Sequence, residues 1–450
     1  MDILQIILSL KSYILLPLLM LALALIMGAR LLDAVKGALH ISIAQIGISI
    51  LSSFFIETSL PVINAITSLN RGGAGVTDVG WPVIAMLVWS FDVIYIIVPV
   101  YIAVNLLLLW KKWTNIINVD IWNYWHIAVA SLIVYSATGS VLLVIIADII
   151  MSAISIKLCE WANPAVKRYY RTERNQCVST ANSLVYLPVA IVMDWLIDKV
   201  PGIRKLNFQP KELKGELKVL LSPGFVALAA GLALSLGCGH TIAESLDFSV
   251  RFTAVFILLP QVLKFMKEGF SPVADATASF AEKKIGNNRK MYVGVNHLVV
   301  ADDPSVIIST VLLIPVALLM GALISWIDIF PMGDLMNIVS IIIVIVAVCK
   351  GNVIRIVLTS IPVILLNFLL APVVAPVYAG IAERISYDMG GVTGKFAASL
   401  NGSTYINIWL ADLLQGRMYA ILTMPLIIGA GYVCFRYYKK LTMNTKSIIN

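Results

Sequence analysis

The sequence has few charged residues. Only 13% of its 450 residues are charged and 60% are hydrophobic, and the mean hydropathy is +0.91. An average soluble domain is about 25% charged and about 45–50% apolar. The composition therefore excludes a single soluble domain, and it excludes a disordered chain for the same reason. The apolar runs are long and do not alternate with polar residues, which argues against a transmembrane barrel.

Cysteine and several catalytic motifs are also scarce or missing. The five cysteines are scattered and have neither CxxC nor metal-ligand spacing, so we expect no metal site and no disulfide framework. The sequence has no GxxxxGK[ST], GxSxG or HExxH motif, so we expect no P-loop nucleotide, no cofactor and no catalytic residue in this chain. The net charge of +8 comes from basic residues between apolar runs. That pattern is typical of cytoplasmic loops rather than of a nucleic-acid partner.

What the sequence does contain is hydrophobic segments. A spanning helix needs about 20 mostly apolar residues, and about eleven segments come near that length. We therefore predict an all-α, polytopic membrane protein embedded in the lipid bilayer. The segments lie at 12–29, 39–66, 82–110, 126–156, 222–240, 248–266, 298–327, 333–349, 353–381 and 405–434, with a weaker one at 179–198. Polar stretches at 157–176, 199–218 and 264–292 are expected in water.

The basic residues predict the orientation. Arg30 and Lys36 follow the first segment, which places the N-terminus outside, and the basic tail at 437–450 is expected in the cytoplasm. If 126–156 and 179–198 both cross, the basic stretch between them lies outside, against the positive-inside rule. If both are re-entrant hairpins, every basic loop lies inside. Both arrangements stay open.

The chain is predicted to form one integral membrane domain over 1–450 with two halves. The first half covers about 1–221 and starts outside, whereas the second covers about 222–436 and starts inside. This is the pattern of an inverted repeat, in which broken helices at the repeat interface form the substrate site.

Two polar strings near segment ends are candidates for such a site. Residues 72–82 are rich in glycine and include Asp78 and Trp81, where an aromatic face and a carboxylate could meet a sugar. The alternative is an outside turn followed by a helix start. Residues 118–126 include Asp120 and His126. Their alternative is an interfacial aromatic belt.

Other candidates are polar residues at breaks between apolar segments, where backbone and side-chain groups could meet a polyol. Asp303 has the alternative role of capping the next helix. Non-helical backbone at membrane depth is tolerated only beside protein or a water-filled cavity, so we include the break at 137–140. The candidates are Thr138, Ser140, Asn296, Asp303, Asp334, Asn401 and Ser403.

At these motifs the chain resembles a known family over nearly its whole length. It is similar to the membrane subunit, enzyme IIC (EIIC), of the galactitol family of the phosphoenolpyruvate-dependent sugar phosphotransferase system (PTS), which is related to the ascorbate permeases. The residues that carry the resemblance are Asp78-Val-Gly-Trp-Pro82, Asn118-Val-Asp-Ile-Trp-Asn-Tyr-Trp-His126, Ala137-Thr-Gly-Ser140, Lys199-Val-Pro-Gly-Ile-Arg204 and Gly333-Asp334.

The resemblance implies a homodimeric, elevator-type permease in the bacterial cytoplasmic membrane. It implies that a polyol moves inward and is phosphorylated by the cysteine-phosphate of a separate IIB protein, which is charged by a IIA protein. By analogy with the ascorbate branch, His126 is the first substrate contact to expect. The sequence departs from the family at Ser179-Thr180-Ala181 and at Gly294-Val295-Asn296, so galactitol and a related polyol or sugar both remain candidates.

Two other classes of function were weighed. A proton-coupled secondary transporter would rest on Asp92 and Asp148, because carboxylates within apolar segments are costly and usually functional. A membrane scaffold without transport would not require polar strings at segment breaks, so it is disfavoured.

Overall fold

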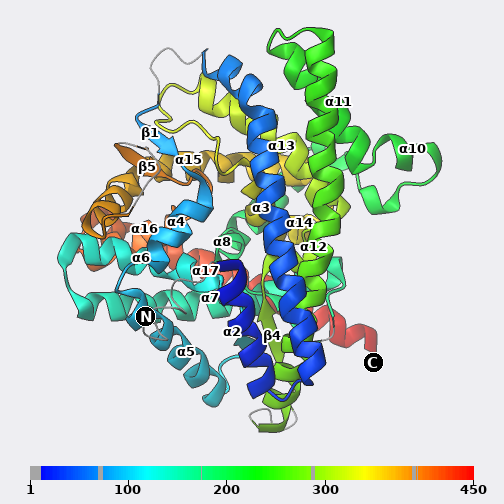
Figure 1. The fold of residues 1–450 in the computed structure, drawn as a ribbon. Coiled ribbons are helices and arrows are strands. Elements are labelled where there is room, and N and C mark those ends of the chain that lie inside the picture. The colour runs from blue at the N-terminus through cyan, green and yellow to red at the C-terminus, as the bar shows by residue number, and fades with distance from the viewer. Residues whose placement is uncertain are drawn as a thin grey trace.

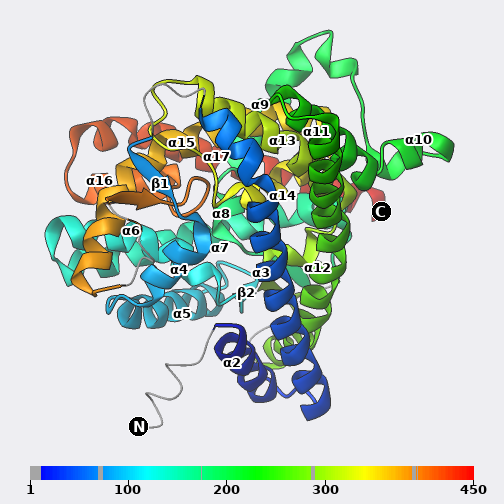
Figure 2. The same cartoon turned by 45° about the horizontal axis from the view of Figure 1, so that its top comes forward.

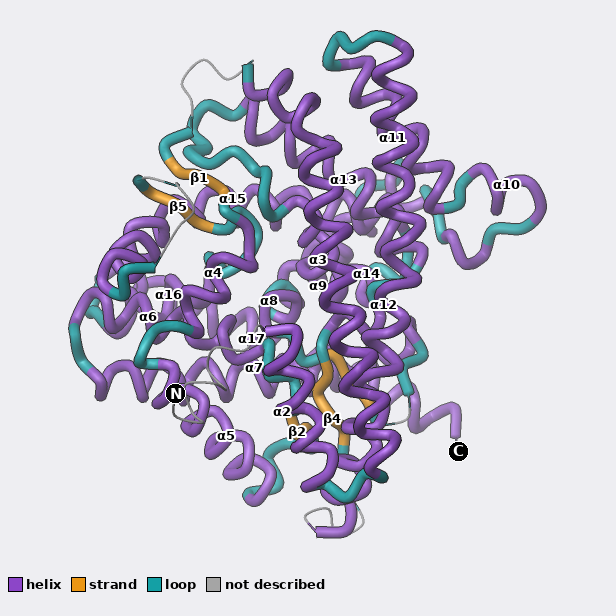
Figure 3. Tube along the Cα trace, viewed as in Figure 1, coloured by secondary structure: helices purple, strands orange, loops and turns teal. Residues whose placement is uncertain are grey.

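The computed structural model describes residues 12–68, 74–173, 175–284, 289–387, 392 and 394–449. Helices dominate this part of the chain (Figure 3). Within the described ranges, seven helices are long and apolar enough to cross a membrane, or eight if the bent pair of α4 (Gly80–Trp89) and α5 (Ile94–Trp110) is one broken span. Four shorter apolar helices accompany them. The structure therefore confirms an all-α polytopic architecture.

Four helices form a group that we call the long-helix group. In it, α12 packs against α2, α3 and α11, and α2 also packs against α3. The two longest, α3 and α12, lie side by side in both views (Figures 1 and 2). The members are α2 (Ser12–Ile26), α3 (Leu31–Thr67), α11 (Pro223–Gly237) and α12 (Ile242–Lys284). Because α12 continues to Lys284, most of the polar stretch predicted at 264–292 is helix rather than loop.

The remaining elements form what we call the central body, whose innermost helix is α14, with all 11 residues buried. Its first-half elements are β1 (Val76–Asp78), α4 (Gly80–Trp89), α5 (Ile94–Trp110), β2 (Ile116–Asn118), α6 (Asn123–Thr138), α7 (Val141–Tyr170), β3 (Gln176–Val178), α8 (Ala181–Leu184) and α9 (Leu187–Lys199). Its second-half elements are β4 (Tyr292–Val295), η3 (His297–Val300), α13 (Pro304–Leu323), η4 (Leu335–Asn337), α14 (Ile338–Val348), α15 (Val353–Arg384), β5 (Lys395–Ala397), α16 (Tyr405–Leu414) and α17 (Met418–Ile449).

Three apolar runs that the sequence presents as continuous are divided in the structure. The run at 82–110 becomes α4 and α5, bent by 92° where Ser90–Val93 interrupt the helix. The run at 405–434 divides between α16 and α17. The run at 126–156 divides at Gly139, whose φ of +63° ends α6, and Ser140 then caps α7. The predicted break at 137–140 is thus confirmed as a tight turn between two helices.

The strands pair across the two halves of the sequence. In the first sheet, β1 pairs in parallel with β5, and Val76 also forms a bridge with Ile329. In the second sheet, β4 lies between β2 and β3, again in parallel. Strand β1 of the first half thus pairs with β5 and Ile329 of the second half, and β4 of the second half pairs with β2 and β3 of the first. The two halves are therefore interlocked. The two sheets lie in separate parts of the body (Figure 3).

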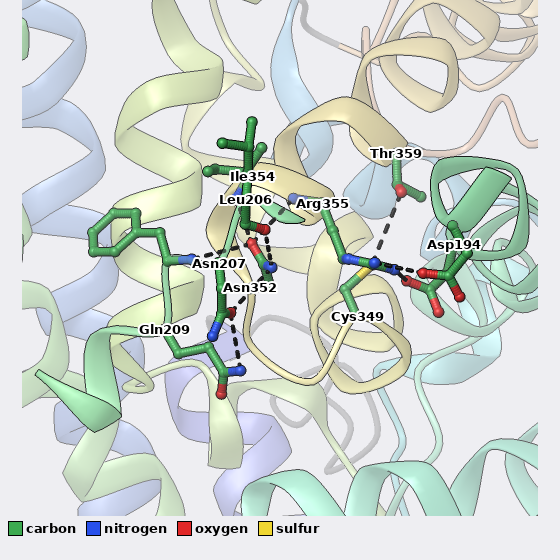
Figure 4. A network of polar contacts seen from close by, with 11 residues as sticks. Asp194, Leu206, Asn207, Gln209, Cys349, Asn352, Ile354, Arg355 and Thr359 are labelled. Atoms are coloured by element: carbon green, nitrogen blue, oxygen red, sulfur yellow. Dashed lines mark hydrogen bonds and ion pairs between the residues drawn. The ribbon is translucent and has the colours of Figure 1, made fainter. Parts of the chain in front are cut away.

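The connection between the halves is fastened to the central body (Figure 4). It contains η1 (Ile203–Lys205), η2 (Pro210–Glu212) and α10 (Gly215–Leu220). The Asn352 side chain caps α15, accepts a hydrogen bond from the Phe208 N–H at 3.5 Å and donates to the Leu206 carbonyl at 3.0 Å. One helical turn on, Arg355 pairs with Asp194 of α9 at 2.7 Å. This polar network joins the connection, α9 and α15.

Candidate functional site

A cavity of about 480 Å³ lies between the long-helix group and the central body. Its polar lining from the central body comes from helix starts and from the residues that follow strands. Its lining contains no Asp, Glu, Lys or Arg side chain among the described residues. Residues that line it from the body include Trp81, Trp125, His126, Asn296, His297 and Asn401, and those from the long-helix group include Gln45, Ser49 and Leu263.

Three buried polar atoms in this lining have no hydrogen-bond partner in the part of the chain that the structure describes. They are Oε1 of Gln45, Nδ1 of His126 and Oδ1 of Asn401. A buried polar atom without a partner costs roughly 1–3 kcal/mol. Three such atoms around one cavity indicate that a polar ligand or water completes their hydrogen bonds.

Aromatic rings form much of the remaining wall. Trp81, Trp89, Trp122 and Trp125 line the cavity, and the Trp125 ring centroid lies 3.9 Å from that of His126. Small-molecule sites are commonly apolar and aromatic with a few placed polar groups. The arrangement suits an uncharged, hydroxyl-rich molecule with C–H faces.

Behind the cavity, two carboxylates organise the first sheet. Asp78 accepts backbone N–H hydrogen bonds from Gly80 and Ser399 on Oδ1, and from Met332 and Asp334 on Oδ2. Asp334 in turn accepts from the Trp81 N–H at 3.1 Å and the Leu400 N–H at 2.9 Å. Both carboxylates are buried. They bind the ends of chain segments that lie far apart in the sequence.

This close packing requires glycine at two positions. Gly80 has a φ of +73°, and a Cβ there would lie 2.6 Å from the Gly333 carbonyl oxygen. A Cβ on Gly333 would lie 2.7 Å from the Gly80 nitrogen. Two backbones therefore meet directly beside the carboxylates, which no larger residue permits. Gly72 and Gly73 of the same glycine-rich string lie outside the described residues.

A second polar group follows the second sheet. Asp120 is fully buried and accepts from Nδ2 of Asn296 at 3.3 Å and from the Thr180 hydroxyl at 3.4 Å. The same hydroxyl accepts from the His297 N–H at 3.0 Å. Oδ1 of Asn296 caps η3 through the Leu298 N–H. Asp120 thus positions Asn296, which lines the cavity, without lining it itself.

The family model described as "PTS system sugar-specific permease component" matches residues 6–401. This chain belongs to that family. Its members are multi-pass inner-membrane proteins, and membership implies a sugar substrate and IIB and IIA partner proteins.

The permease is similar to several curated proteins. It is 26% identical over 435 residues to the PTS system galactitol-specific EIIC component of Escherichia coli strain K12, covering 96% of this chain and 94% of that protein. The galactitol-specific component of E. coli O157:H7 matches equally. A putative permease IIC component of strain K12 is 23% identical over 399 residues, covering 89% of this chain and 91% of that protein. These relatives confirm the resemblance to the galactitol family.

Four of the eleven predicted contacts line the permease's cavity: Trp81, His126, Asn296 and Asn401. Asp78, Asp120 and Asp334 lie behind it, with hydrogen bonds inside the protein. Ser403 is also buried outside the lining, and its hydroxyl has no partner among the residues described.

The remaining three lie at helix starts or turns. Thr138 and Ser140 make local hydrogen bonds at the α6–α7 turn. Asp303 caps α13 through the Ser305 N–H, as the alternative reading proposed, and pairs with Lys211 of the connection at 2.5 Å. The contact of these residues with substrate stays a prediction.

Sequence reasoning missed other lining residues of this permease, among them His297, Trp125 and Gln45. His297 follows Asn296 directly and is one of only four histidines, so its rarity was a usable signal. Trp125 belongs to the string at 118–126, for which the sequence leaves an interfacial aromatic belt open as the alternative. Gln45 lies within a long apolar run, where its spacing with Ser49, Ser52 and Ser53 was the available signal.

The described residues place no group of three His, Cys, Asp or Glu side chains to hold a metal ion. Two cysteines nevertheless meet in the central body, where Sγ of Cys159 and Sγ of Cys177 lie 3.5 Å apart. Both are buried and neither lines the cavity.

Proposed function

We propose that the permease binds galactitol or a closely related polyol in the cavity between the long-helix group and the central body. The observation that carries this proposal is the lining: unpartnered neutral polar atoms, tryptophan faces and no charged side chain among the described residues. A neutral polyol fits such a wall, because its hydroxyls both donate and accept hydrogen bonds. An anionic sugar would lack a cationic partner there. The galactitol-specific relatives support the same substrate class.

In this proposal His126 and Asn401 contact the hydroxyls directly, and Asn296 contacts them while Asp120 holds its side chain in place. Asp78 and Asp334 then hold Trp81 and Asn401 in position and do not contact the substrate. The polyol moves inward and receives the phosphoryl group from the cysteine-phosphate of IIB, so that the P–S bond breaks and a P–O bond to a substrate hydroxyl forms.

We infer that the central body moves past the long-helix group as an elevator. The interlocked sheets support this, because strands shared between both halves favour motion of the body as one unit. The long-helix group would then be static and would mediate a homodimer. The orientation we propose has the N-terminus outside and the C-terminus in the cytoplasm.

A second, larger cavity of about 1080 Å³ is the proposed docking side for the phosphocarrier protein. It is lined by charged side chains of both signs, mostly from α3 and α12. The lysines are Lys36, Lys264, Lys267, Lys283 and Lys284, and the acidic residues are Asp33, Glu173, Glu268, Asp275 and Asp302. By the positive-inside rule these lysines face the cytoplasm. The IIB protein, which carries an anionic phosphoryl group, would dock on this side.

The deciding experiment measures uptake of labelled galactitol into cells with and without the partner IIB. We expect accumulation of galactitol phosphate when IIB is present, and loss of accumulation when it is removed. Free galactitol inside cells, driven by an imposed proton gradient without IIB, would overturn the proposal.

That outcome would favour proton-coupled transport, and one observation supports this alternative. Asp148 of α7 is fully buried, and its Oδ2 has no partner in the described part of the chain. A buried carboxylate of this kind is a candidate for carrying a proton. Asp148 does not line the cavity, so the group-translocation proposal is preferred.

A further inference from the structure

The part of the 480 Å³ cavity wall that α3 forms is more polar than the part that α12 forms. Here α12 presents Leu259, Leu263 and Met266, which are all apolar. By contrast, α3 lines the same cavity with four polar side chains, together with Ile48, Phe55 and Ile56. The polar four are Gln45, Ser49, Ser52 and Ser53.

These four residues are spaced as one helix face. From Gln45 they follow at i+4, i+7 and i+8, which places them on one side of an α-helix. The helix that carries them, Leu31–Thr67, is one of the seven that are long and apolar enough to cross the membrane. Polar side chains in such helices normally face a protein partner or a water-filled path.

Among the described residues, the side-chain oxygen of Gln45 has no hydrogen-bond partner that would explain its position. Its Oε1 is buried and accepts no hydrogen bond from any described residue. Neighbouring Ser42 differs, because its hydroxyl donates to the Ala38 carbonyl at 3.2 Å and does not line the cavity. One polar side chain of α3 is therefore satisfied by its own helix, whereas the next lines the cavity with an acceptor that has no partner among the described residues.

We propose that Gln45 is a specificity-determining contact, supplied by the long-helix group, for one hydroxyl of the polyol. The inference rests on the function proposed above. An amide both donates and accepts, so it matches a hydroxyl in either role. Because His126 and Asn401 belong to the central body, Gln45 makes the site depend on both parts of the molecule. Substrate selection then takes place across the boundary between them.

The test measures binding of galactitol and its monodeoxy analogues to the purified full chain in detergent by calorimetry. Gln45→Met keeps the side-chain length and removes the hydrogen bond, so we expect the Kd for galactitol to rise roughly tenfold. For wild type, one monodeoxy analogue should lose a similar factor. For Gln45→Met, that analogue and galactitol should bind equally. If Gln45 had only a structural role, Gln45→Met would still bind that analogue more weakly than galactitol.

Gln45→Asn serves as a second variant, because it keeps a polar amide on α3 but withdraws it by one methylene; it should weaken binding in the same direction. Ser42→Ala is the matched control and should bind as wild type does. Galactitol affinity in both Gln45 variants equal to wild type would overturn the inference, as would equal weakening for every analogue. If wild type itself binds no polyol, the proposed function fails instead.

Discussion

Three buried carboxylates behind the cavity differ from two neutral side chains that line it. Behind it, the Asp78, Asp120 and Asp334 carboxylates all have protein hydrogen-bond partners. At the cavity, His126 and Asn401 each leave a buried atom open. The carboxyl groups thus hold the structure, and the His126 and Asn401 side chains each keep an atom for a ligand.

This difference follows from the chemistry of broken segments. Wherever a strand or helix ends in the membrane, backbone N–H groups lose their regular partners and must find others. The two oxygens of a carboxyl group accept several hydrogen bonds, so Asp78 can satisfy four N–H groups at once. Such a group stabilises the break in the chain without contacting the substrate.

Replacing a carboxylate behind the cavity should have the largest effect. Asp78→Asn keeps the shape but sets an NH₂ donor against two backbone N–H donors, and each unsatisfied group costs roughly 1–3 kcal/mol. We expect a large loss of folded protein and a lower Tm in detergent. Asp247→Asn, at an exposed ion pair with Arg251, is the control and should change the Tm little. A normal Tm with abolished galactitol binding would instead make Asp78 a substrate contact.

Replacing an open cavity group should affect transport and spare the fold. We expect His126→Ala to reduce galactitol uptake below about a tenth of wild type, because a buried contact is lost, while the protein remains folded in the membrane. Uptake of labelled galactitol, normalised to folded protein, measures this. His240→Ala, at the turn between α11 and α12, should retain uptake. Wild-type uptake by His126→Ala would remove that residue from the site.

The smallest effect is expected away from both regions. Cys177→Ser changes a buried thiol that does not line the cavity and is not one of the carboxyl groups behind it. We expect uptake within about twofold of wild type, since a hydroxyl can keep the weak hydrogen bond to the Val293 carbonyl. Loss of phosphorylation in this variant would show that the chain's own cysteines take part in the chemistry.

The fold class and several site strings could be predicted from the sequence because they depend on local composition. Long apolar runs predicted membrane helices, and the small residues at 137–140 predicted a turn. The roles of Asp78 and Asp334 could not be predicted, because their partners are backbone groups of Met332, Ser399 and Leu400, which only the folded chain brings near.

Gln45 was hidden for a different reason. Its spacing with Ser49, Ser52 and Ser53 shows a polar helix face, but the sequence does not show what that face meets, and its significance depends on the cavity that it lines. The bend between α4 and α5 was likewise masked, since Phe91 and Val93 continue the apolar run through the break around Asp92.

The pairing of strands across the halves has a consequence for biosynthesis. Asp78 and the Ser399 N–H that it binds are 321 residues apart. At a synthesis rate of about 5–20 residues per second, that interval corresponds to roughly 16–64 s. Until then Asp78 lacks the Ser399 N–H donor, and β1 lacks its partner strand β5. The first sheet can therefore be completed only when nearly the whole chain has been made.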